Sequence, residues 1–317
     1  MDLRTVYGQE KRLKRQKTVR NILSSFCALI LIACFLIGGR PLEQKFSQAF
    51  GLSKDEDGSE AVIDFLDVGQ ASCSLISSGE EYALVDTGHE DQNGIVAYNR
   101  LKNLGAKRVK YVFISHCHKD HAGGLLGLLG NIPIENIVLS NQIFSEETEY
   151  YFSKVTTLAV EHGVNIIYPK NRQEFYLGRG KITVYVPDDC YQSNENCSIA
   201  LLSEFCSVKT LFMGDNGFAE ENWLINNGCD IDADILAVGH HGSKYATGER
   251  FLDEVSPFAA VLSFGYNSYG HPTDEVLGSL EKRNCDYYYT FDDNKLCAVI
   301  YDGGFRILTE QSEEKGE

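Results

Sequence analysis

The pattern of apolar and polar positions predicts two groups of strands, each interrupted by helices. Short β-branched and aromatic runs bounded by turn residues are typical of strands, whereas apolar residues every three or four positions are typical of helices. We expect strands at residues 61–68, 71–77, 82–85, 109–114, 137–139, 164–168, 181–186, 198–202, 208–213, 235–238, 260–264, 287–291, 297–301 and 305–308. We expect helices at residues 95–104, 147–161, 218–225 and 273–282, with another beginning near residue 125. Two sheets with helices on their outer faces satisfy this order, which predicts an α/β protein with one αββα sandwich domain over residues 61–309.

The N-terminal stretch has a different pattern, because residues 21–39 contain no charged side chain. Nineteen helical residues span roughly 28 Å, close to the hydrocarbon thickness of a bilayer. Seven Lys and Arg against two acids precede this segment in residues 1–20, so the positive-inside rule places the N-terminus in the cytoplasm. A cleaved signal peptide is the alternative, although its apolar region spans only about 7–15 residues. We expect a single-pass anchor in the cell membrane at 21–39, a linker at 40–60 and an extracytoplasmic domain.

Charge is unevenly distributed along the chain. The formal net charge is −16, and since residues 1–20 hold a net +5, the remainder carries −21. Proteins that bind nucleic acid usually display a basic face, so this balance opposes a large nucleic-acid interface. The charged segment 310–317 is expected to be disordered.

Candidate metal ligands are concentrated after the expected strand 109–114. His116, His118, Asp120 and His121 fall within six residues, and imidazole and carboxylate are ligands shared by zinc, iron and manganese. The spacing of two places His116 and His118 on one side of an extended loop, which suits a first metal. Asp120 and His121 face elsewhere and suit a second metal.

Further candidate ligands follow other strands. Asp215 comes after an apolar strand, where its carboxylate would bridge two ions, and His240 follows another strand and would complete the second site. Asp86 also follows a strand. Two metals about 3.5–4 Å apart lower the pKa of a bridging water and stabilise charge on a substrate. The recurrence at strand ends predicts one site assembled from several strands.

These motifs carry a resemblance to the metallo-β-lactamase superfamily. They are the His-x-His-x-Asp-His motif of residues 116–121, Leu84–Gly88, Gly214-Asp215 and the strand end at His240. Other stretches resemble one branch, the hydrolase-like domain of the ComEC/Rec2 DNA-internalisation competence proteins. Those stretches are Phe65–Gln70, Asn194–Ser198, Gly239–Ser243 and Gly270–Pro272. The resemblance covers about residues 61–308.

The resemblance implies an αββα sandwich with a dinuclear site between its sheets. It implies two divalent ions, zinc or manganese, with His116 and His118 on the first and Asp120, His121 and His240 on the second. Asp215 would bridge them. Asp86 and His241 would support the ligands from behind rather than bind metal.

Two departures from the family pattern change what it implies. Most superfamily enzymes have a third histidine before the strand that leads to Asp215, where this chain has Asn194 and Asn196. An amide oxygen is a harder and weaker donor than imidazole, so the first site would bind its metal less tightly or would favour manganese over zinc. This pattern also allows the protein to bind only one metal. The chain also has one apolar segment instead of a multi-span channel, so DNA transport would need separate channel or uptake proteins as partners.

Other polar residues are candidates for substrate contact. Ser243 and Lys244 are expected to hold a phosphate oxygen, with a plain polar loop as the alternative. His271, held between Gly270 and Pro272, is expected to contact the substrate or protonate its leaving group. For Tyr266 and Tyr269, an exposed turn is favoured over a base-stacking role.

Three functions fit these residues. The leading hypothesis is a membrane-anchored, metal-dependent hydrolase in which a metal-bridging hydroxide attacks phosphodiesters, including those of DNA, with Asp120, Asp215 and His271 in catalytic roles. The first alternative keeps this chemistry but acts on a small lactone, thioester or β-lactam, which an acidic surface does not oppose. The second alternative is a non-catalytic metal-binding module.

Overall fold

The computed structural model describes residues 59–143, 145–187, 197–291 and 296–309. The expected anchor (21–39), the linker as far as residue 58, Asn194, Asn196 and the tail (310–317) lie outside these ranges. Within the described ranges, every helix is too short or too polar to cross a bilayer.

Fifteen strands of the described residues form two sheets. The eight-stranded sheet has the order β15-β14-β1-β2-β3-β4-β5-β6, and the seven-stranded sheet the order β13-β12-β11-β10-β9-β8-β7. The first sheet contains β1 (Ser59–Phe65), β2 (Ser74–Ser78), β3 (Glu81–Val85), β4 (Val109–Ile114), β5 (Ile134–Leu139), β6 (Asn165–Ile167), β14 (Leu296–Tyr301) and β15 (Gly304–Thr309). The second contains β7 (Gln173–Leu177), β8 (Gly180–Tyr185), β9 (Ala200–Phe205), β10 (Val208–Phe212), β11 (Ile235–Ala237), β12 (Ala259–Leu262) and β13 (Asp286–Tyr289).

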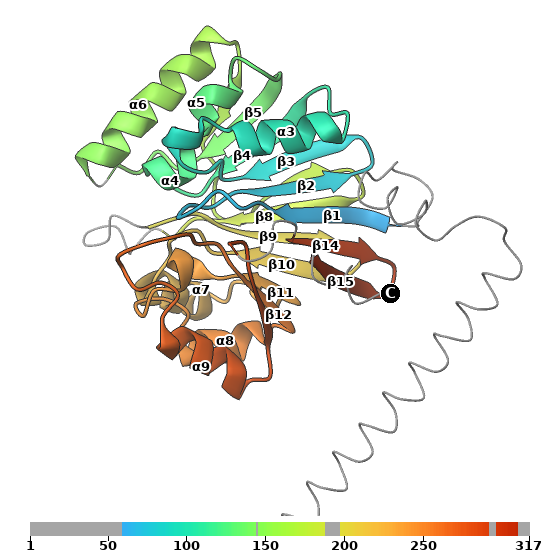
Figure 1. The fold of residues 1–317 in the computed structure, drawn as a ribbon, viewed down its shortest axis with the longest axis vertical. Coiled ribbons are helices and arrows are strands. Elements are labelled where there is room, and N and C mark those ends of the chain that lie inside the picture. Colours follow the sequence, from blue (N-terminus) through green and yellow to red (C-terminus); the bar gives the residue numbers. More distant parts are fainter. Residues whose placement is uncertain (1–58, 144, 188–196, 292–295, 310–317) are drawn as a thin grey trace, which may run out of the picture. The chain divides into compact units, whose positions relative to one another are not determined.

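Helices cover the outer face of each sheet, as Figure 1 shows. The first sheet packs against α3 (Ile95–Asn103), α4 (Lys119–Ala122), α5 (Leu125–Leu128) and α6 (Glu146–Glu161). The second packs against α7 (Phe218–Asn226), α8 (Glu249–Val255) and α9 (Asp274–Lys282). Two short 3₁₀ turns, η1 (Glu90–Gln92) and η2 (Gly239–Gly242), complete the described elements. The predicted αββα sandwich is confirmed.

Each sheet combines antiparallel and parallel strands. β3 to β6 are parallel in the first sheet and β10 to β13 are parallel in the second, whereas the other neighbours are antiparallel. Parallel neighbours need crossover connections, and helices supply most of them here. The carboxyl ends of the parallel strands therefore open into loops that are free to carry functional residues.

Alternate residues of the central strands pack in different layers. In β4, Phe113 packs between the sheets with Phe175 of β7, whose ring lies edge-on at a centroid distance of 5.3 Å. Its neighbours Val112 and Ile114 pack instead under the helices of the first sheet. A strand buried on both faces is apolar throughout, because successive side chains point to opposite faces.

Most of the expected elements are present, with shifted ends. The expected strand 71–77 begins only at Ser74, and β1 begins at Ser59, within the expected linker. β7 and α8 were not predicted. β7 is an edge strand in which the exposed Glu174 and Tyr176 alternate with the buried Phe175 and Leu177, so its apolar face is short.

A buried carboxylate joins α7 to the chain after η2. Glu221 is 3% exposed and accepts backbone hydrogen bonds from the N–H groups of Thr247 and Gly248. Burial raises the pKa of its carboxyl to about 7, although these two hydrogen bonds favour the ionised form. Glu221 thereby holds in place the segment that follows the His240-His241 pair.

We expect Glu221 to make the stability of the fold depend on pH. Its pKa in the folded state lies above the ordinary value of 4.5, so between these values the folded chain binds more protons than the unfolded chain. Stability therefore falls as the pH rises through this window, by roughly 2 kcal/mol between pH 5 and pH 7. Glu221→Gln keeps the shape but does not titrate, so urea unfolding of this variant should show a smaller loss over the same range. Equal losses in both proteins would contradict this assignment.

Candidate metal centre

The ligand candidates converge from loops that follow parallel strands of both sheets. β4 leads into the segment 116–121, which includes the start of α4. In the second sheet β10 leads to Asp215, and β11 leads to η2 with its His240-His241 pair. The prediction of a site at strand ends is therefore supported by the positions of these segments.

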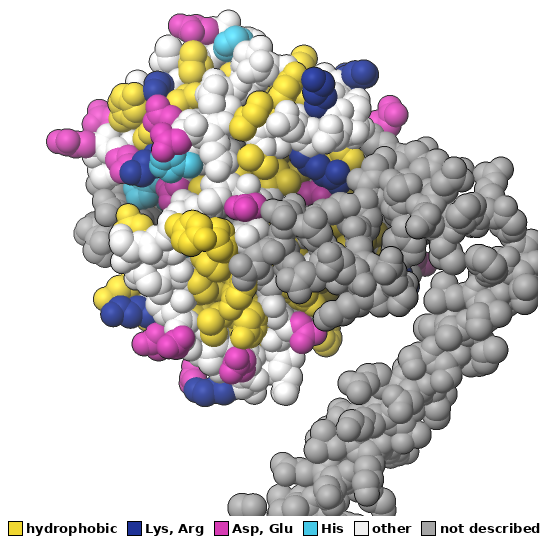
Figure 2. All heavy atoms as spheres, viewed as in Figure 1, with side chains coloured by type: hydrophobic (Ala, Val, Ile, Leu, Met, Phe, Trp, Pro, Cys, Tyr) yellow, Lys and Arg dark blue, Asp and Glu magenta, His cyan; other side chains and the backbone are white. Residues whose placement is uncertain are grey.

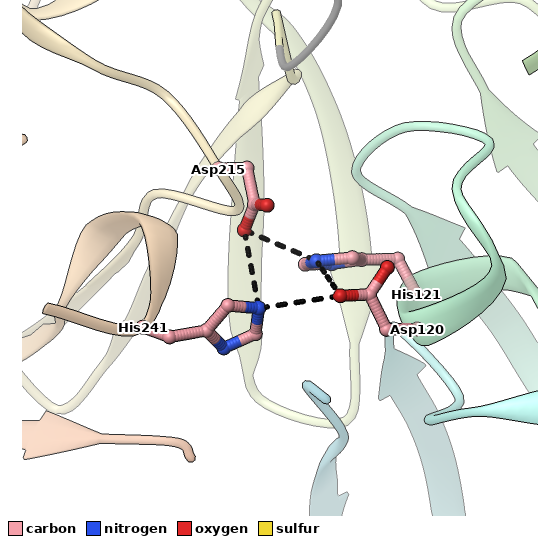
Figure 3. Close-up of side chains that lie close together, drawn as sticks. All are labelled: Asp120, His121, Asp215 and His241. Carbon is pink, nitrogen blue, oxygen red and sulfur yellow. Dashed lines mark ion pairs between the residues drawn. The ribbon is translucent and has the colours of Figure 1, made fainter. Parts of the chain in front are cut away.

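Four side chains form one compact cluster, which is shown in Figure 3. One ligand atom from each of Asp120, His121, Asp215 and His241 lies within 4.8 Å of the corresponding atoms of the others. Asp215 Oδ1 is 3.1 Å from His121 Nε2 and 3.7 Å from His241 Nε2. Asp120 Oδ2 is 4.0 Å from His121 Nε2 and 3.4 Å from His241 Nε2. Two carboxylates and two imidazole nitrogens thus face a common point.

Each imidazole of the cluster is oriented from behind. His121 donates from Nδ1 to Asp86 Oδ2 at 2.8 Å, and His241 donates from Nδ1 to the carbonyl oxygen of Ser263 at 2.7 Å. These bonds leave both Nε2 atoms directed into the cluster. Hydrogen bonds of this kind fix the tautomer and orientation of metal-binding histidines.

Asp86 is itself held by the residue that precedes the histidine motif. Its carboxylate accepts the backbone N–H of Ser115 at 2.7 Å and the Ser115 hydroxyl at 2.9 Å. The structure thus places Asp86 behind His121, in the supporting position that the resemblance implies. The part played by Ser115 was missed, although the residue stands directly before the motif.

Electrostatics couple the four residues. Burial alone lowers the pKa of the His121 imidazole, but the three carboxylates around it outweigh burial and raise that pKa well above its ordinary value. Burial raises the pKa of the Asp215 and Asp120 carboxyls, yet the imidazoles of the cluster hold both pKa values below their usual range. The carboxylates therefore remain ionised, and the cluster favours positive charge at its centre.

Three atoms of the cluster are buried without a hydrogen-bond partner in the described part of the chain. They are His121 Nε2, Asp215 Oδ1 and His241 Nε2. Burying a polar atom unpaired costs free energy, so three such atoms converging on one point need an explanation. A divalent cation satisfies all three at once, and a mixed nitrogen and oxygen donor set suits zinc, manganese or iron. The residues therefore fit a metal ion.

His116 and His118 lie beside this cluster rather than within it. Their Nε2 and Nδ1 atoms are 2.9 Å apart, and the His116 ring centroid is 4.3 Å from that of His121. Burial, followed by the neighbouring His121, lowers the pKa of His116 well below its ordinary value, which keeps its imidazole neutral. The Ser198 hydroxyl is 3.2 Å from His116 Nδ1. The His116 and His118 imidazoles next to the cluster suit the first metal that the sequence predicts.

The neighbouring histidines of η2 take different positions. Both have left-handed backbone conformations, with φ of 50° at His240 and 55° at His241. His241 points into the four-residue cluster, although the resemblance assigned it a supporting role. His240 Nε2 lies 3.7 Å from Asp215 Oδ2, and its ring lies 5.7 Å from that of His271. Of the two neighbouring histidines, His241 rather than His240 belongs to the four-residue cluster.

The cluster opens into a cleft of about 700 Å³. Asp120, Asp215 and both histidines of η2 line it, together with His118, Lys119, His271 and the loop 266–269. Histidine and acidic side chains lie side by side on the surface near α4 (Figure 2). Three of the four cluster residues therefore line a cleft that is open to solvent.

Two predicted contact residues lie elsewhere. Ser243 is 2% exposed and its hydroxyl accepts the N–H of Tyr245, whereas the exposed Lys244 extends over the Tyr245 ring. Neither is among the described residues that line the cleft. His271 does line it, and Asn194 and Asn196 are outside the described residues.

One protein-family model matches part of the chain. Residues 66–188 match the model of the metallo-beta-lactamase superfamily, a range that contains Asp86 and the whole 116–121 motif. The resemblance predicted from the sequence is confirmed, and with the fold and the cluster it supports a metal-dependent hydrolase-like domain.

Among curated proteins, the chain is similar to competence and recombination proteins. ComE operon protein 3 of Bacillus subtilis (strain 168) is 29% identical over 71% of this chain and 31% of that protein. Competence protein ComA of Neisseria gonorrhoeae is 27% identical over 80% of this chain and 35% of that protein. Recombination protein 2 of Haemophilus influenzae is 28% identical over 69% of this chain. The matched part of the chain spans between 26% and 35% of the length of these relatives.

Solved structures share the fold. The metallo-beta-lactamase fold protein YhfI from Bacillus subtilis has a TM-score of 0.51 and 13% identity over 78% of this chain and 99% of that chain. CmlA, a diiron beta-hydroxylase from Streptomyces venezuelae, has the same TM-score and identity over 84% of this chain and 59% of that chain. Identities this low show the architecture alone.

Proposed function

We propose that this protein is a metal-dependent hydrolase of phosphodiester bonds, with nucleic acid as its substrate. The observation that carries the proposal is the convergence, beside an open cleft, of three buried ligand atoms that lack a hydrogen-bond partner among the described residues. Competence and recombination proteins among the relatives support a nucleic-acid substrate.

The cluster side chains would hold the metal. Asp120, His121, Asp215 and His241 supply its ligands, and His116 and His118 supply those of a second ion. A divalent ion in such a site acts as a Lewis acid and lowers the pKa of bound water. Asp86 and the Ser263 carbonyl keep the two cluster imidazoles in the tautomer that offers Nε2 to the metal. The chain's contribution is thus an oriented set of donors.

His271 would contact the substrate. It lines the cleft, and its Nδ1 atom is buried without a hydrogen-bond partner among the described residues. Burial, followed by the nearby imidazoles of His240 and His241, lowers its pKa, so its ring is neutral at pH 7. A neutral imidazole donates one hydrogen bond to a phosphate oxygen or exchanges a proton at the leaving oxygen.

We also propose the cellular setting expected from the sequence. Residues 21–39 would anchor the chain in the cell membrane, with the N-terminus cytoplasmic and the hydrolase domain outside. Separate channel or uptake proteins would then act as partners in handling DNA. The run of nineteen uncharged residues after a basic cluster supports the anchor.

One observation favours a second candidate, a hydrolase of a small lactone, thioester or β-lactam. Four carboxylates line the cleft, those of Asp91, Asp120, Glu147 and Asp215. Among the described lining residues the only Lys or Arg is Lys119. Such a charge balance does not attract a polyanion through charge alone.

Substrate panels distinguish the two functions. The full-length protein with zinc or manganese is expected to hydrolyse bis-nitrophenyl phosphate and labelled DNA, and EDTA is expected to abolish both activities. Asp215→Asn should be inactive on both, because it removes a cluster carboxylate. Hydrolysis of lactones, thioesters or β-lactams without phosphodiester cleavage would replace the proposal by the second candidate. Inactivity on every substrate despite bound metal would leave a non-catalytic metal-binding module.

A further inference from the structure

We propose that Tyr266 and Tyr269 form a stacking site for unpaired nucleobases at the edge of the cleft, which makes single-stranded nucleic acid the preferred substrate. This inference rests on the proposed function and extends it to substrate selection. It concerns two side chains that do not belong to the metal cluster.

Both tyrosines are unusually exposed. Tyr266 is 91% and Tyr269 is 74% exposed, which makes them the two most exposed large hydrophobic side chains of the described residues. A single exposed aromatic ring is ordinary, but two on one short loop beside a functional cleft mark a binding surface.

The loop that carries them is held rigidly. The Asn267 amide group donates to the carbonyl oxygens of Gly265 and His271 and accepts the N–H groups of Tyr269 and His271. The Gly265 N–H also donates to the side-chain oxygen of Gln70 in the loop after β1. The exposed rings are therefore presented by a preorganised backbone, which reduces the entropy lost when a ligand binds.

Neighbouring rings support each tyrosine from one side. The Phe291 ring meets Tyr266 edge-on at a centroid distance of 4.7 Å and 77°. The His271 ring stacks on Tyr269 at 5.7 Å and 29°. Since both tyrosines stay highly exposed despite these contacts, each retains ring surface on which a planar base can stack.

The position and charge of the cleft explain why stacking would matter. Both tyrosines line the same cleft as Asp120, Asp215 and His271, so a stacked base would bring its phosphate close to the metal cluster. Among the described lining residues there are four carboxylates and one lysine, so side-chain contacts to phosphate supply little affinity. Stacking of bases on aromatic rings supplies about 1–3 kcal/mol per base and requires bases that are not paired in a duplex.

The test measures binding without turnover. We would follow fluorescence anisotropy of the full-length protein in EDTA with three labelled probes: a ten-residue oligo-dT, an abasic strand of the same length and a duplex. The oligo-dT is expected to bind at least about tenfold more tightly than the other two, because one stacked base supplies that much. The double variant Tyr266→Ala/Tyr269→Ala should lose this difference, whereas Tyr266→Phe/Tyr269→Phe should keep it.

Tyr176→Ala is the matched control, because Tyr176 is 60% exposed on the edge strand β7 and does not line the cleft. It should bind oligo-dT as the wild type does. Equal binding of oligo-dT and the abasic strand, or no effect of the double alanine variant, would overturn the inference. Metal-dependent hydrolysis of bis-nitrophenyl phosphate by the wild type tests the proposed function separately. A failure of the proposed function can therefore be told apart from a failure of the stacking inference.

Discussion

Asp215→Asn is expected to weaken zinc binding by roughly 10²- to 4 × 10³-fold. The Asp215 carboxylate is 4% exposed and lies within 3.7 Å of the Nε2 atoms of both cluster imidazoles. An amide has the same shape but no negative charge, so the buried site loses half of its carboxylate charge. Removing one partner of a buried charged set costs about 3–5 kcal/mol, which corresponds to the stated loss in affinity.

Titration calorimetry of the metal-stripped, full-length protein measures this loss. Asp230→Asn makes the same chemical change at a surface carboxylate that pairs with Lys209, so its zinc affinity should match that of the wild type. An Asp215→Asn variant that binds zinc within about threefold of the wild type would show that this carboxylate is not a ligand.

His241→Ala and His240→Ala are expected to have different effects, although the residues are neighbours. His241 directs Nε2 into the cluster, so its loss should raise the metal concentration needed for half-maximal activity by about 10²-fold. His240 lies at the cleft beside His271, so its loss should leave that concentration within about threefold and lower the rate at saturating metal instead.

Metal titrations of bis-nitrophenyl phosphate hydrolysis give both values for each variant. The comparison is internally matched, because both substitutions remove one imidazole from η2. The reverse result, with strong metal dependence in His240→Ala and little in His241→Ala, would assign the ligand position to His240 as the sequence suggested.

The fold was largely predictable because its strands are short apolar runs with clear limits. β4, buried on both faces, is apolar almost throughout and was found at Val109–Ile114. β7 was missed because an edge strand needs only a short apolar face, here Phe175 and Leu177. α8 was missed although Phe251, Leu252 and Val255 are buried, because seven residues make too few helical turns for the apolar repeat to be recognised.

The site was predictable where several metal-binding residues lie close together in the sequence or directly after a strand. Residues 116–121 carry their own signature, and Asp86 and Asp215 follow recognisable strands. The distinction between His240 and His241 depends on two consecutive left-handed residues, for which adjacent histidines give no signal. The Ser263 carbonyl that orients His241 is a backbone group that any residue supplies, so only the fold reveals it.

The loop that carries Tyr266 and Tyr269 was also only partly predictable from the sequence. Its turn residues were visible in the sequence, and an exposed turn was expected. The four hydrogen bonds of Asn267 and the position of both rings at the cleft depend on contacts from other parts of the fold.

Metal content is the most direct test of the account. Elemental analysis of the purified full-length protein, beside Asp215→Asn and the surface variant Asp230→Asn, counts bound metal per chain. We expect at least one equivalent of a transition metal in the wild type and in Asp230→Asn, a second equivalent if the His116–His118 pair is filled, and strong depletion in Asp215→Asn. A wild-type protein that binds no metal, even after incubation with zinc and manganese, would contradict the central claim.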